Sequence, residues 1–331
     1  MHVTRHSTRD ISTMIAVAKA FYFEGRSKVK IAADMGLSRF KVAQLLSDAR
    51  DLGIIKFVIT DPFDVQSSLK KFLENELAIE SVVLVADSGQ IQEDRDALAA
   101  KTAELLVRDV TEGSVIGLSW GRTLAGLGSA IEYLPEVDVV QLTGLVGTDP
   151  THSPLRLMTT LNPGFQVRSH ALLSPLFVSS AATAEGMRHE PDVDGVFSWY
   201  DKLDIAILSI GSWANGITQL GQYFSDTEKR RIDEAGAIAD FAGIFIDSRG
   251  NEVAEEFAAR RISVSLDQLR QTRHVIAAAA GEGKATAIVA TARAGVLDTL
   301  VTTVTTAMRL EELLRAERDD LQPKSALASG S

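Results

Sequence analysis

The pattern of apolar and polar positions divides the chain into a short helical segment and a longer segment of alternating strands and helices. Over the first 60 residues, apolar side chains recur at the spacing of a helix, as at Ile11, Ile15, Ala18 and Tyr22. From about residue 80, short apolar runs alternate with helical stretches, which is typical of a largely parallel sheet covered on both faces. The expected divisions are a helical domain over 1–60, a linker helix over 61–79, an open α/β domain over 80–315 and a disordered tail over 316–331.

The first domain is expected to be a helix-turn-helix. Lys28–Met35 and Arg39–Leu52 have helical periodicity, and Gly36 between them supplies a tight turn because glycine adopts positive φ without steric cost. Ser38 is a good N-cap for the helix that begins at Arg39. This geometry places the second helix in a DNA major groove. After it, Ile54–Ile59 is a short run rich in β-forming residues.

The helix that begins at Arg39 presents the side chains that would contact DNA. Arginine and lysine reach guanine edges or phosphates, and glutamine bonds adenine through two hydrogen bonds. Phe40 would either meet a thymine methyl group or pack within the domain. The predicted DNA-binding residues are Lys28, Ser38, Arg39, Phe40, Lys41 and Gln44. The alternative interpretation is a three-helix interaction module with a solvated basic face.

The charge distribution favours the DNA-binding interpretation. The whole chain has 34 basic and 44 acidic residues and a net charge of −10, which alone disfavours nucleic-acid binding. Residues 1–60, however, have ten basic and five acidic side chains, or +5, whereas the remaining 271 residues have 24 and 39, or −15. A basic module on an acidic body is typical of a nucleic-acid-binding domain joined to another function.

Composition excludes several classes of chemistry. The chain has no cysteine, which excludes disulfides, thiolate metal sites and cysteine nucleophiles. No apolar run reaches the roughly 18 residues of a membrane span, and no secretion signal is evident, so we expect a cytoplasmic protein. No metal and no cofactor are expected, because metal-ligand spacing is absent from His152, His170, His189 and His274.

The second domain is expected to place its ligand site at the carboxyl ends of its strands. In open α/β sheets, ligands bind at that edge where the strand order reverses. Helical patterns cover Glu93–Asp109 and Arg122–Tyr133, among others. The predicted strands are Ser81–Ala86, Ser114–Leu118, Val137–Leu142, Asp204–Ile210, Ala242–Ile246, Val275–Ala280 and Asp298–Val301.

Loops that follow these strands contain the candidate ligand residues. Gly117–Leu124 lies between a strand and a helix, and its glycines, hydroxyls and outward N–H groups form a plausible phosphate cradle or a simple tight turn. Gly281–Lys284 again opens a helix after a strand. Asp240 either touches the ligand or caps a turn. The predicted ligand-binding residues are Gly117, Ser119, Gly121, Thr123, Gln141, Asp240 and Lys284.

These motifs together resemble the SorC family of bacterial transcriptional regulators, over about residues 11–314. The resemblance rests on the helix-turn-helix, on GLSWGRTL at Gly117–Leu124, on Gly236–Gly250 and on Ala280–Ile288. It implies a DNA-binding module joined to a Rossmann-like sugar-binding domain similar to sugar-phosphate isomerases and glucosamine-phosphate deaminases. It also implies dimers or tetramers, and phosphorylated sugars or polyols as effectors.

By position, the resemblance implies effector contacts at Ser119, Gly121, Thr123 and Lys284, with Gln141 nearby. The sequence departs from the family where an acidic pair usually precedes the last helix, because the chain has Thr303 and Val304 there. It also has Ala239 where glycine is usual.

Two functions remain to be distinguished. The first is a regulator that binds operator DNA and controls carbohydrate or polyol catabolism genes in response to a sugar phosphate or related polyol. The second is an isomerase- or deaminase-like enzyme acting on sugar phosphates. No loop pairs a histidine with carboxylates at a strand end, so no catalytic residue is assigned and the regulator is preferred.

Overall fold

The computed structural model describes residues 8–55, 62–147, 154–161 and 166–321. The chain divides into two compact units, Met1–Pro62 and Phe63–Ser331. Among the described residues, every helix is too short or too polar to cross a membrane.

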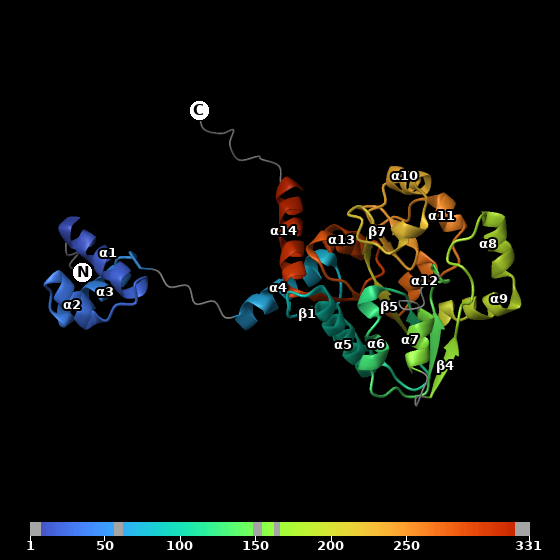
Figure 1. Cartoon of the computed structure of the whole chain (residues 1–331), viewed down its shortest axis with the longest axis horizontal. Coiled ribbons are helices and arrows are strands. Elements are labelled where there is room, and N and C mark those ends of the chain that lie inside the picture. The colour runs from blue at the N-terminus through green and yellow to red at the C-terminus, as the bar shows by residue number, and fades with distance from the viewer. Residues whose placement is uncertain (1–7, 56–61, 148–153, 162–165, 322–331) are drawn as a thin grey trace. The chain divides into compact units, whose positions relative to one another are not determined.

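In its described residues 8–55, the smaller unit contains three helices, α1 (Thr8–Tyr22), α2 (Lys28–Met35) and α3 (Arg39–Asp51) (Figure 1). The predicted turn and cap are confirmed, because Gly36 has φ 65° and the Ser38 hydroxyl accepts a hydrogen bond from the Lys41 N–H at 3.1 Å. The three helices bury one shared core, which includes Met14, Val17, Ile31, Val42, Leu45, Leu46 and Ala49. Ile54 and Ile55 form a bend rather than a strand, and residues 56–59 lie outside the described residues.

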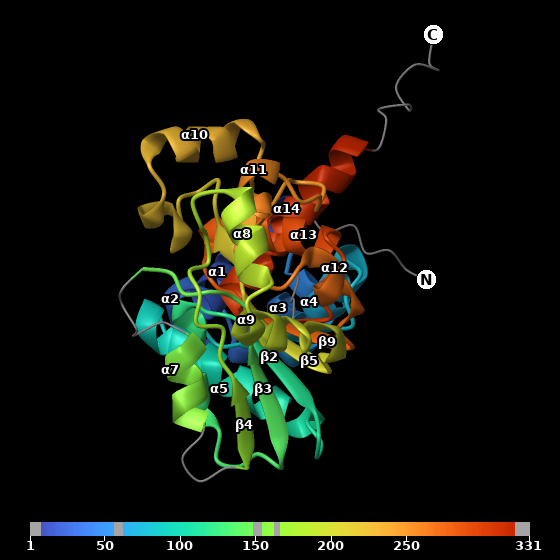
Figure 2. The same ribbon diagram turned by 90° about the vertical axis from the view of Figure 1, so that its right-hand side faces the viewer.

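The larger unit is built on a parallel sheet of seven strands in the order β1-β10-β9-β5-β2-β3-β4. Figure 2 shows β2, β3 and β4 side by side at one end of it. The strands are β1 (Ser81–Val85), β2 (Val115–Leu118), β3 (Val137–Gln141), β4 (Val167–His170), β5 (Ile205–Ser209), β9 (His274–Ala278) and β10 (Thr299–Thr303).

Helices cover both faces of this sheet. On β5, Ile205 and Ile207 point into one apolar core, whereas Ala206 and Leu208 point into the other, as the two-residue period of a strand requires. The first core is closed by α5 (Ile91–Asp109), α6 (Leu127–Ala130) and α7 (Pro154–Leu161). The second is closed by α4 (Pro62–Leu77), α8 (Ala181–Arg188), α9 (Pro191–Phe197), α12 (Leu266–Gln271), α13 (Ala285–Arg293) and α14 (Val304–Leu321).

A second, antiparallel sheet follows β5 directly. It consists of β6 (Gly211–Ser212), β7 (Ala239–Phe241) and β8 (Ile244–Ile246). The expectation of one strand over Ala242–Ile246 is therefore wrong, because Ala242 and Gly243 have φ values of 49° and 79° and form the two-residue turn of a hairpin. An aromatic cluster of Trp213, Phe224, Phe245 and Phe257 packs in the same region, with α10 (Asp226–Glu234) and α11 (Glu255–Ala259).

Other predicted boundaries also change. The helix expected over Arg122–Tyr133 is instead a short 3-10 turn, η1 (Arg122–Leu124), followed by the short helix α6. Gly128 lets α6 pack closely on α7, because a Cβ at this position would lie 3.0 Å from Thr160. The linker helix begins at Pro62, and proline is tolerated at the first residue of a helix because the N–H that it lacks would have no partner within the helix. The tail expected to be disordered is helical as far as Leu321. Further short turns are η3 (Tyr200–Lys202), η4 (Leu220–Tyr223) and η5 (Glu282–Lys284).

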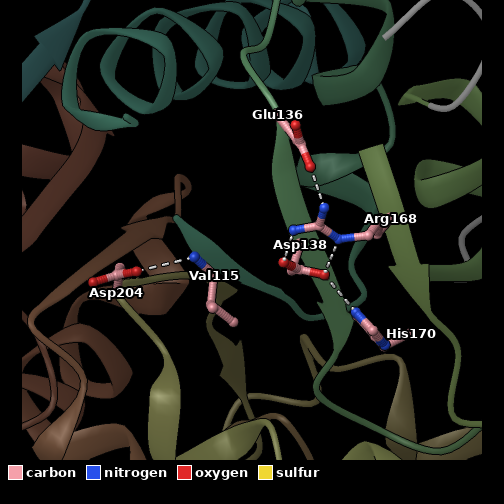
Figure 3. A network of polar contacts seen from close by, with 6 residues as sticks. All are labelled: Val115, Glu136, Asp138, Arg168, His170 and Asp204. Atoms are coloured by element: carbon pink, nitrogen blue, oxygen red, sulfur yellow. Dashed lines mark hydrogen bonds and ion pairs between the residues drawn. The ribbon is translucent and has the colours of Figure 1, made fainter. Parts of the chain in front are cut away.

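The edge strand β4 was missed because its sequence is mostly polar, and a polar network holds it to β3 (Figure 3). The Asp138 carboxylate accepts hydrogen bonds from Arg168 Nε at 3.0 Å and Nη2 at 2.7 Å, and its Oδ1 lies 2.8 Å from His170 Nε2. Arg168 also pairs with Glu136. At the start of β2, Asp204 accepts from the Val115 N–H at 2.9 Å.

Asp138 should therefore make the stability of the larger unit depend on pH. The hydrogen bonds from Arg168 hold its pKa below the usual range, so its contribution is present above about pH 4 and is lost as the pH falls through the folded-state pKa. We expect Asp138→Asn to lower the free energy of unfolding by about 1–2 kcal/mol at pH 7. Urea titrations at several pH values should show this difference shrinking below about pH 4.

The matched control is Glu136→Gln, which removes an exposed partner of the same arginine. We expect it to change stability by less than about 0.5 kcal/mol, because exposed ion pairs contribute little. Equal losses in both variants, or a pH-independent loss for Asp138→Asn, would contradict the assignment.

Candidate functional site

A cavity of about 330 Å³ opens at the carboxyl edge of the parallel sheet. After β2 the chain continues outward through β3 and β4, whereas after β5 it continues in the opposite direction through β9 and β10. The strand order therefore reverses between β2 and β5, which is where open α/β sheets bind ligands. The loops after both strands line the cavity, through Trp120, Arg122 and Thr123 after β2, and Ser209, Ile210 and Gly211 after β5.

A partly buried lysine and a buried aspartate line the same cavity from two other elements. Lys284 ends η5, and its Nζ donates a hydrogen bond to the Ile210 carbonyl at 2.7 Å. Asp240 lies on β7 and pairs with Gly211 of β6. A Cβ on Gly211 would stand only 2.4 Å from Asp240 Oδ1. Glycine at position 211 therefore provides the room that the Asp240 carboxylate occupies.

The protonation of this pair is set by its burial. Burial raises the pKa of Asp240 to about 6, and it lowers the pKa of Lys284 to about 8. Each charge opposes the effect of burial on the other, so both groups are charged between these two values. Asp240 Oδ1 is buried without a hydrogen-bond partner among the described residues, which leaves an acceptor for a hydroxyl group of a ligand.

Two arginines add positive charge to the wall. Arg95 comes from the first turns of α5 and Arg122 from η1, and among the described residues neither makes an ion pair or a side-chain hydrogen bond. Burial lowers the pKa of Arg95, and the charge of Arg122 lowers it further. By contrast, Asp87 and Asp94 on the same wall accept hydrogen bonds from the Thr305 N–H and from Ser88, respectively. The unpaired cations favour an anionic ligand group.

Hydroxyls and an indole complete the lining. Thr303 Oγ1 at the end of β10 and Thr306 Oγ1 in the first turn of α14 lie 2.9 Å apart, and Thr306 also accepts from the Gly281 N–H at 2.8 Å. Trp120 contributes an aromatic surface of the kind that packs against the apolar face of a sugar ring. The lining thus combines three cations with four carboxylates, of which Asp240 has one oxygen without a partner, and with hydroxyls and an aromatic ring. This combination suits a small, polyhydroxylated ligand with an anionic group.

The structure brings three of the predicted ligand residues, Thr123, Asp240 and Lys284, to this cavity. Gly121 lies between the lining residues Trp120 and Arg122 and has φ 155°. A Cβ there would lie 2.1 Å from Ser209 Oγ, which donates a hydrogen bond to the Trp120 carbonyl at 2.9 Å. This glycine therefore permits close contact between the loops that follow β2 and β5.

The other three predicted residues do not line the cavity. Gln141 is fully buried, and its amide bonds backbone atoms of Thr143 and Leu172, so it orders the loop after β3. Gly117 makes room for Leu142, which would stand 2.6 Å from a Cβ. Ser119 is buried behind the loop, with its N–H bonded to the Ile207 carbonyl. Gly117 and Gln141 lie in β2 and β3, and Ser119 directly follows β2, but their positions in the sequence did not reveal that all three are buried.

Sequence reasoning missed several lining residues, including both arginines. Arg122 stands within the candidate loop Gly117–Leu124, beside the predicted Thr123. Arg95 has a weaker signal, since it lies one turn into a helix that follows a strand and so begins at the ligand-binding edge. Thr303 is the last residue of β10 and Thr306 lies in the first turn of α14; the run of threonines at this strand end is the signal that indicates them.

In the smaller unit, the predicted DNA-contacting side chains lie on the surface. Arg39, Lys41 and Gln44 are exposed on α3, and Lys28 is exposed at the start of α2. Ser38 is exposed as well, although its hydroxyl caps α3. Phe40 is 73 % exposed, so it does not pack within this unit. The result is an exposed helix start with two cations, an amide and an aromatic ring.

Together, a helix-turn-helix and an α/β unit with a polar cavity at its switch point define a ligand-responsive regulator of transcription. A family model described as "Putative sugar-binding domain" matches residues 61–311. The chain is 25% identical to the sorbitol operon regulator of Klebsiella pneumoniae over 306 residues, which cover 90% of this chain and 97% of that protein. It is 24% identical to the deoxyribonucleoside regulator of Bacillus subtilis, over 83% of this chain and 89% of that protein.

A solved structure of a transcriptional regulator has a similar fold. The full-length sorbitol operon regulator SorC from Klebsiella pneumoniae superposes with a TM-score of 0.68 and 25% identity, covering 93% of this chain and all of that one. The chain belongs to the SorC family of transcriptional regulators with a sugar-binding domain. It is a sugar-responsive transcriptional regulator, and the alternative of a sugar-phosphate enzyme is not favoured.

Proposed function

We propose that this regulator binds operator DNA through α3 and that a phosphorylated sugar or polyol in the cavity of the larger unit controls that binding. The observation that supports the effector class is the pair Arg95 and Arg122, two cations without ion-pair partners among the described residues. A phosphate group would satisfy both through charge-assisted hydrogen bonds. Thr123 and Lys284 would then contact the phosphate or the adjoining hydroxyls, and Asp240 would accept from a hydroxyl.

The size of the cavity supports a single sugar unit. At about 330 Å³ it lies at the lower end of the range of small-molecule sites. A monosaccharide or a linear polyol with one phosphate suits that volume, whereas an oligosaccharide exceeds it. The name of the Klebsiella relative refers to sorbitol, which is a polyol of this class.

Control of DNA binding requires that the effector bind one conformation or assembly of the protein more tightly than another. We propose that the protein acts in the cytoplasm as a dimer or tetramer, in which paired α3 helices match two DNA half-sites. The effector would then alter the fit between the helices and the half-sites. By linkage, operator DNA must change the affinity for the effector by the same factor.

A thermal-shift screen of phosphorylated and free pentoses, hexoses and polyols tests the proposal. A matching phosphorylated compound at about 100 times its Kd should stabilise the protein by roughly 2.7 kcal/mol. For a unit of this size we expect the Tm to rise by about 5–10 °C. The unphosphorylated partner of each compound serves as its control. An equal shift with the free sugar would overturn the phosphate assignment, and turnover of a compound would revive the enzyme.

A further inference from the structure

Phe40, at the start of α3, presents an exposed apolar ring beside the cationic side chains of Arg39 and Lys41. Phe40 is the second residue of the helix, and 73 % of it is open to solvent. Burying an aromatic ring is favourable because it removes apolar surface from water, so an exposed phenylalanine at a functional surface suggests a partner there. Its neighbours decide the kind of partner.

The neighbours of Phe40 are basic. The Arg39 guanidinium lies over the Phe40 ring, with its central carbon 4.9 Å from the ring centroid, and Lys41 is exposed on the other side in sequence. No acidic residue occurs in the first turn of α3. A partner at this surface must therefore present negative charge and an apolar group together. The major groove of DNA presents both, as phosphates and as thymine methyl groups.

We propose that Phe40 reads the C5-methyl group of a thymine, on the base pair next to a guanine that Arg39 reads. This inference rests on the proposed function, because it places the start of α3 in the major groove. Arginine bonds guanine O6 and N7, and phenylalanine packs against the thymine methyl. The Arg39 guanidinium lies 4.9 Å from the Phe40 ring centroid, so the two side chains would meet base pairs that are close together in the groove.

The N-cap fixes where these two side chains begin. Because the Ser38 hydroxyl bonds the Lys41 N–H, α3 starts at Arg39, and the first turn has a defined orientation. Val42, Leu45 and Leu46 hold the opposite face of α3 in the core of the smaller unit. Phe40 is thus presented on a rigid element, and contact with a methyl group requires no rearrangement of the backbone.

The test compares thymine with uracil, which differ only in this methyl group. Full-length protein selects bound duplexes from a randomised library, and each thymine of the selected site is then replaced by uracil in turn. We expect one thymine in each half-site whose replacement weakens binding about fourfold, the factor for burying one methyl-sized group. That thymine should adjoin a conserved guanine. Fluorescence anisotropy at fixed salt measures each affinity.

Variants assign the effect to the ring. Phe40→Ala should bind the thymine duplex about fourfold more weakly or worse and should no longer distinguish thymine from uracil. Phe40→Leu should retain part of the discrimination, because it remains apolar. The matched control is Phe23→Ala, which removes another exposed ring of the same unit, at the end of α1, and should leave both affinities unchanged. Circular dichroism checks that every variant is folded.

Three results would overturn the inference. In the first, uracil replaces every thymine without loss of wild-type affinity. In the second, Phe40→Ala keeps the full uracil sensitivity. In the third, Phe40→Ala changes the oligomer mass measured by light scattering while thymine discrimination persists, which would assign the ring to a protein contact. Failure of the protein to select any duplex is a separate outcome, because it overturns the proposed DNA binding itself.

Discussion

Replacing Arg39 by alanine is expected to weaken binding of the full-length protein to its selected DNA duplex by about 10- to 100-fold. Arg39 is exposed at the start of α3, where its guanidinium would bond a guanine edge. The loss should be greatest for the best site, so specificity at that base relaxes as well. Anisotropy titrations against the selected duplex and a guanine-to-adenine variant measure both effects.

Lys41→Ala provides the contrasting case on the same turn. A lysine that contacts a phosphate contributes equally to all sequences, so its removal should weaken every duplex and lower the slope of log affinity against log salt by about 1. Arg50→Ala is the matched control, because Arg50 is an exposed cation in the last turn of α3. Unchanged DNA affinity in both Arg39→Ala and Lys41→Ala would refute the assignment of α3 as the recognition helix.

Lys284→Met should abolish the thermal shift produced by the best compound of the screen. Its ammonium group is partly buried in the cavity wall, where a charged contact is screened less by solvent than on the open surface. We expect the affinity to fall at least about 100-fold, the effect of removing one partner from a buried charge pair. The binding should also weaken above about pH 8, because Lys284 then loses its proton.

The lysine variant leaves Asp240 without its opposing charge, which should lower the Tm of the free protein, so the shift is measured relative to each variant's own baseline. Thr123→Ala supplies a second, milder variant, since Thr123 lines the same cavity without bonding to Asp240. Lys229→Met removes an exposed lysine of α10 and is the control. An undiminished shift in both Lys284→Met and Thr123→Ala would place the effector elsewhere.

These two experiments also separate the two units of the chain. The Arg39 and Lys41 variants should respond normally to the effector, because their substitutions lie in Met1–Pro62. The Lys284 and Thr123 variants should bind DNA with wild-type affinity in the absence of effector but should not change that affinity when effector is added. A regulator requires both halves of this pattern, since coupling between DNA and effector is reciprocal.

Local patterns determined most of the smaller unit. Gly36 defines a turn through its backbone and Ser38 a cap through its side chain, so the end of α2 and the start of α3 followed from the sequence. Strands such as β2 and β5 were also predictable, because both faces of a central parallel strand are buried and the sequence is continuously apolar. The polar edge strand β4 lacks that signal.

The sequence by itself determined the class of protein, since the charge division and the loop motifs both lie in the order of residues. It also placed Thr123, Asp240 and Lys284 among the candidates. Only the tertiary structure decided which candidates meet, because the strand order brings the ends of β2, β5, β9 and β10 to one cavity and turns Gln141 into the core. Arg95 precedes Arg122 by 27 positions in the sequence, yet both line this cavity. The sheet topology brings the two arginines to one site, and local periodicity does not encode that.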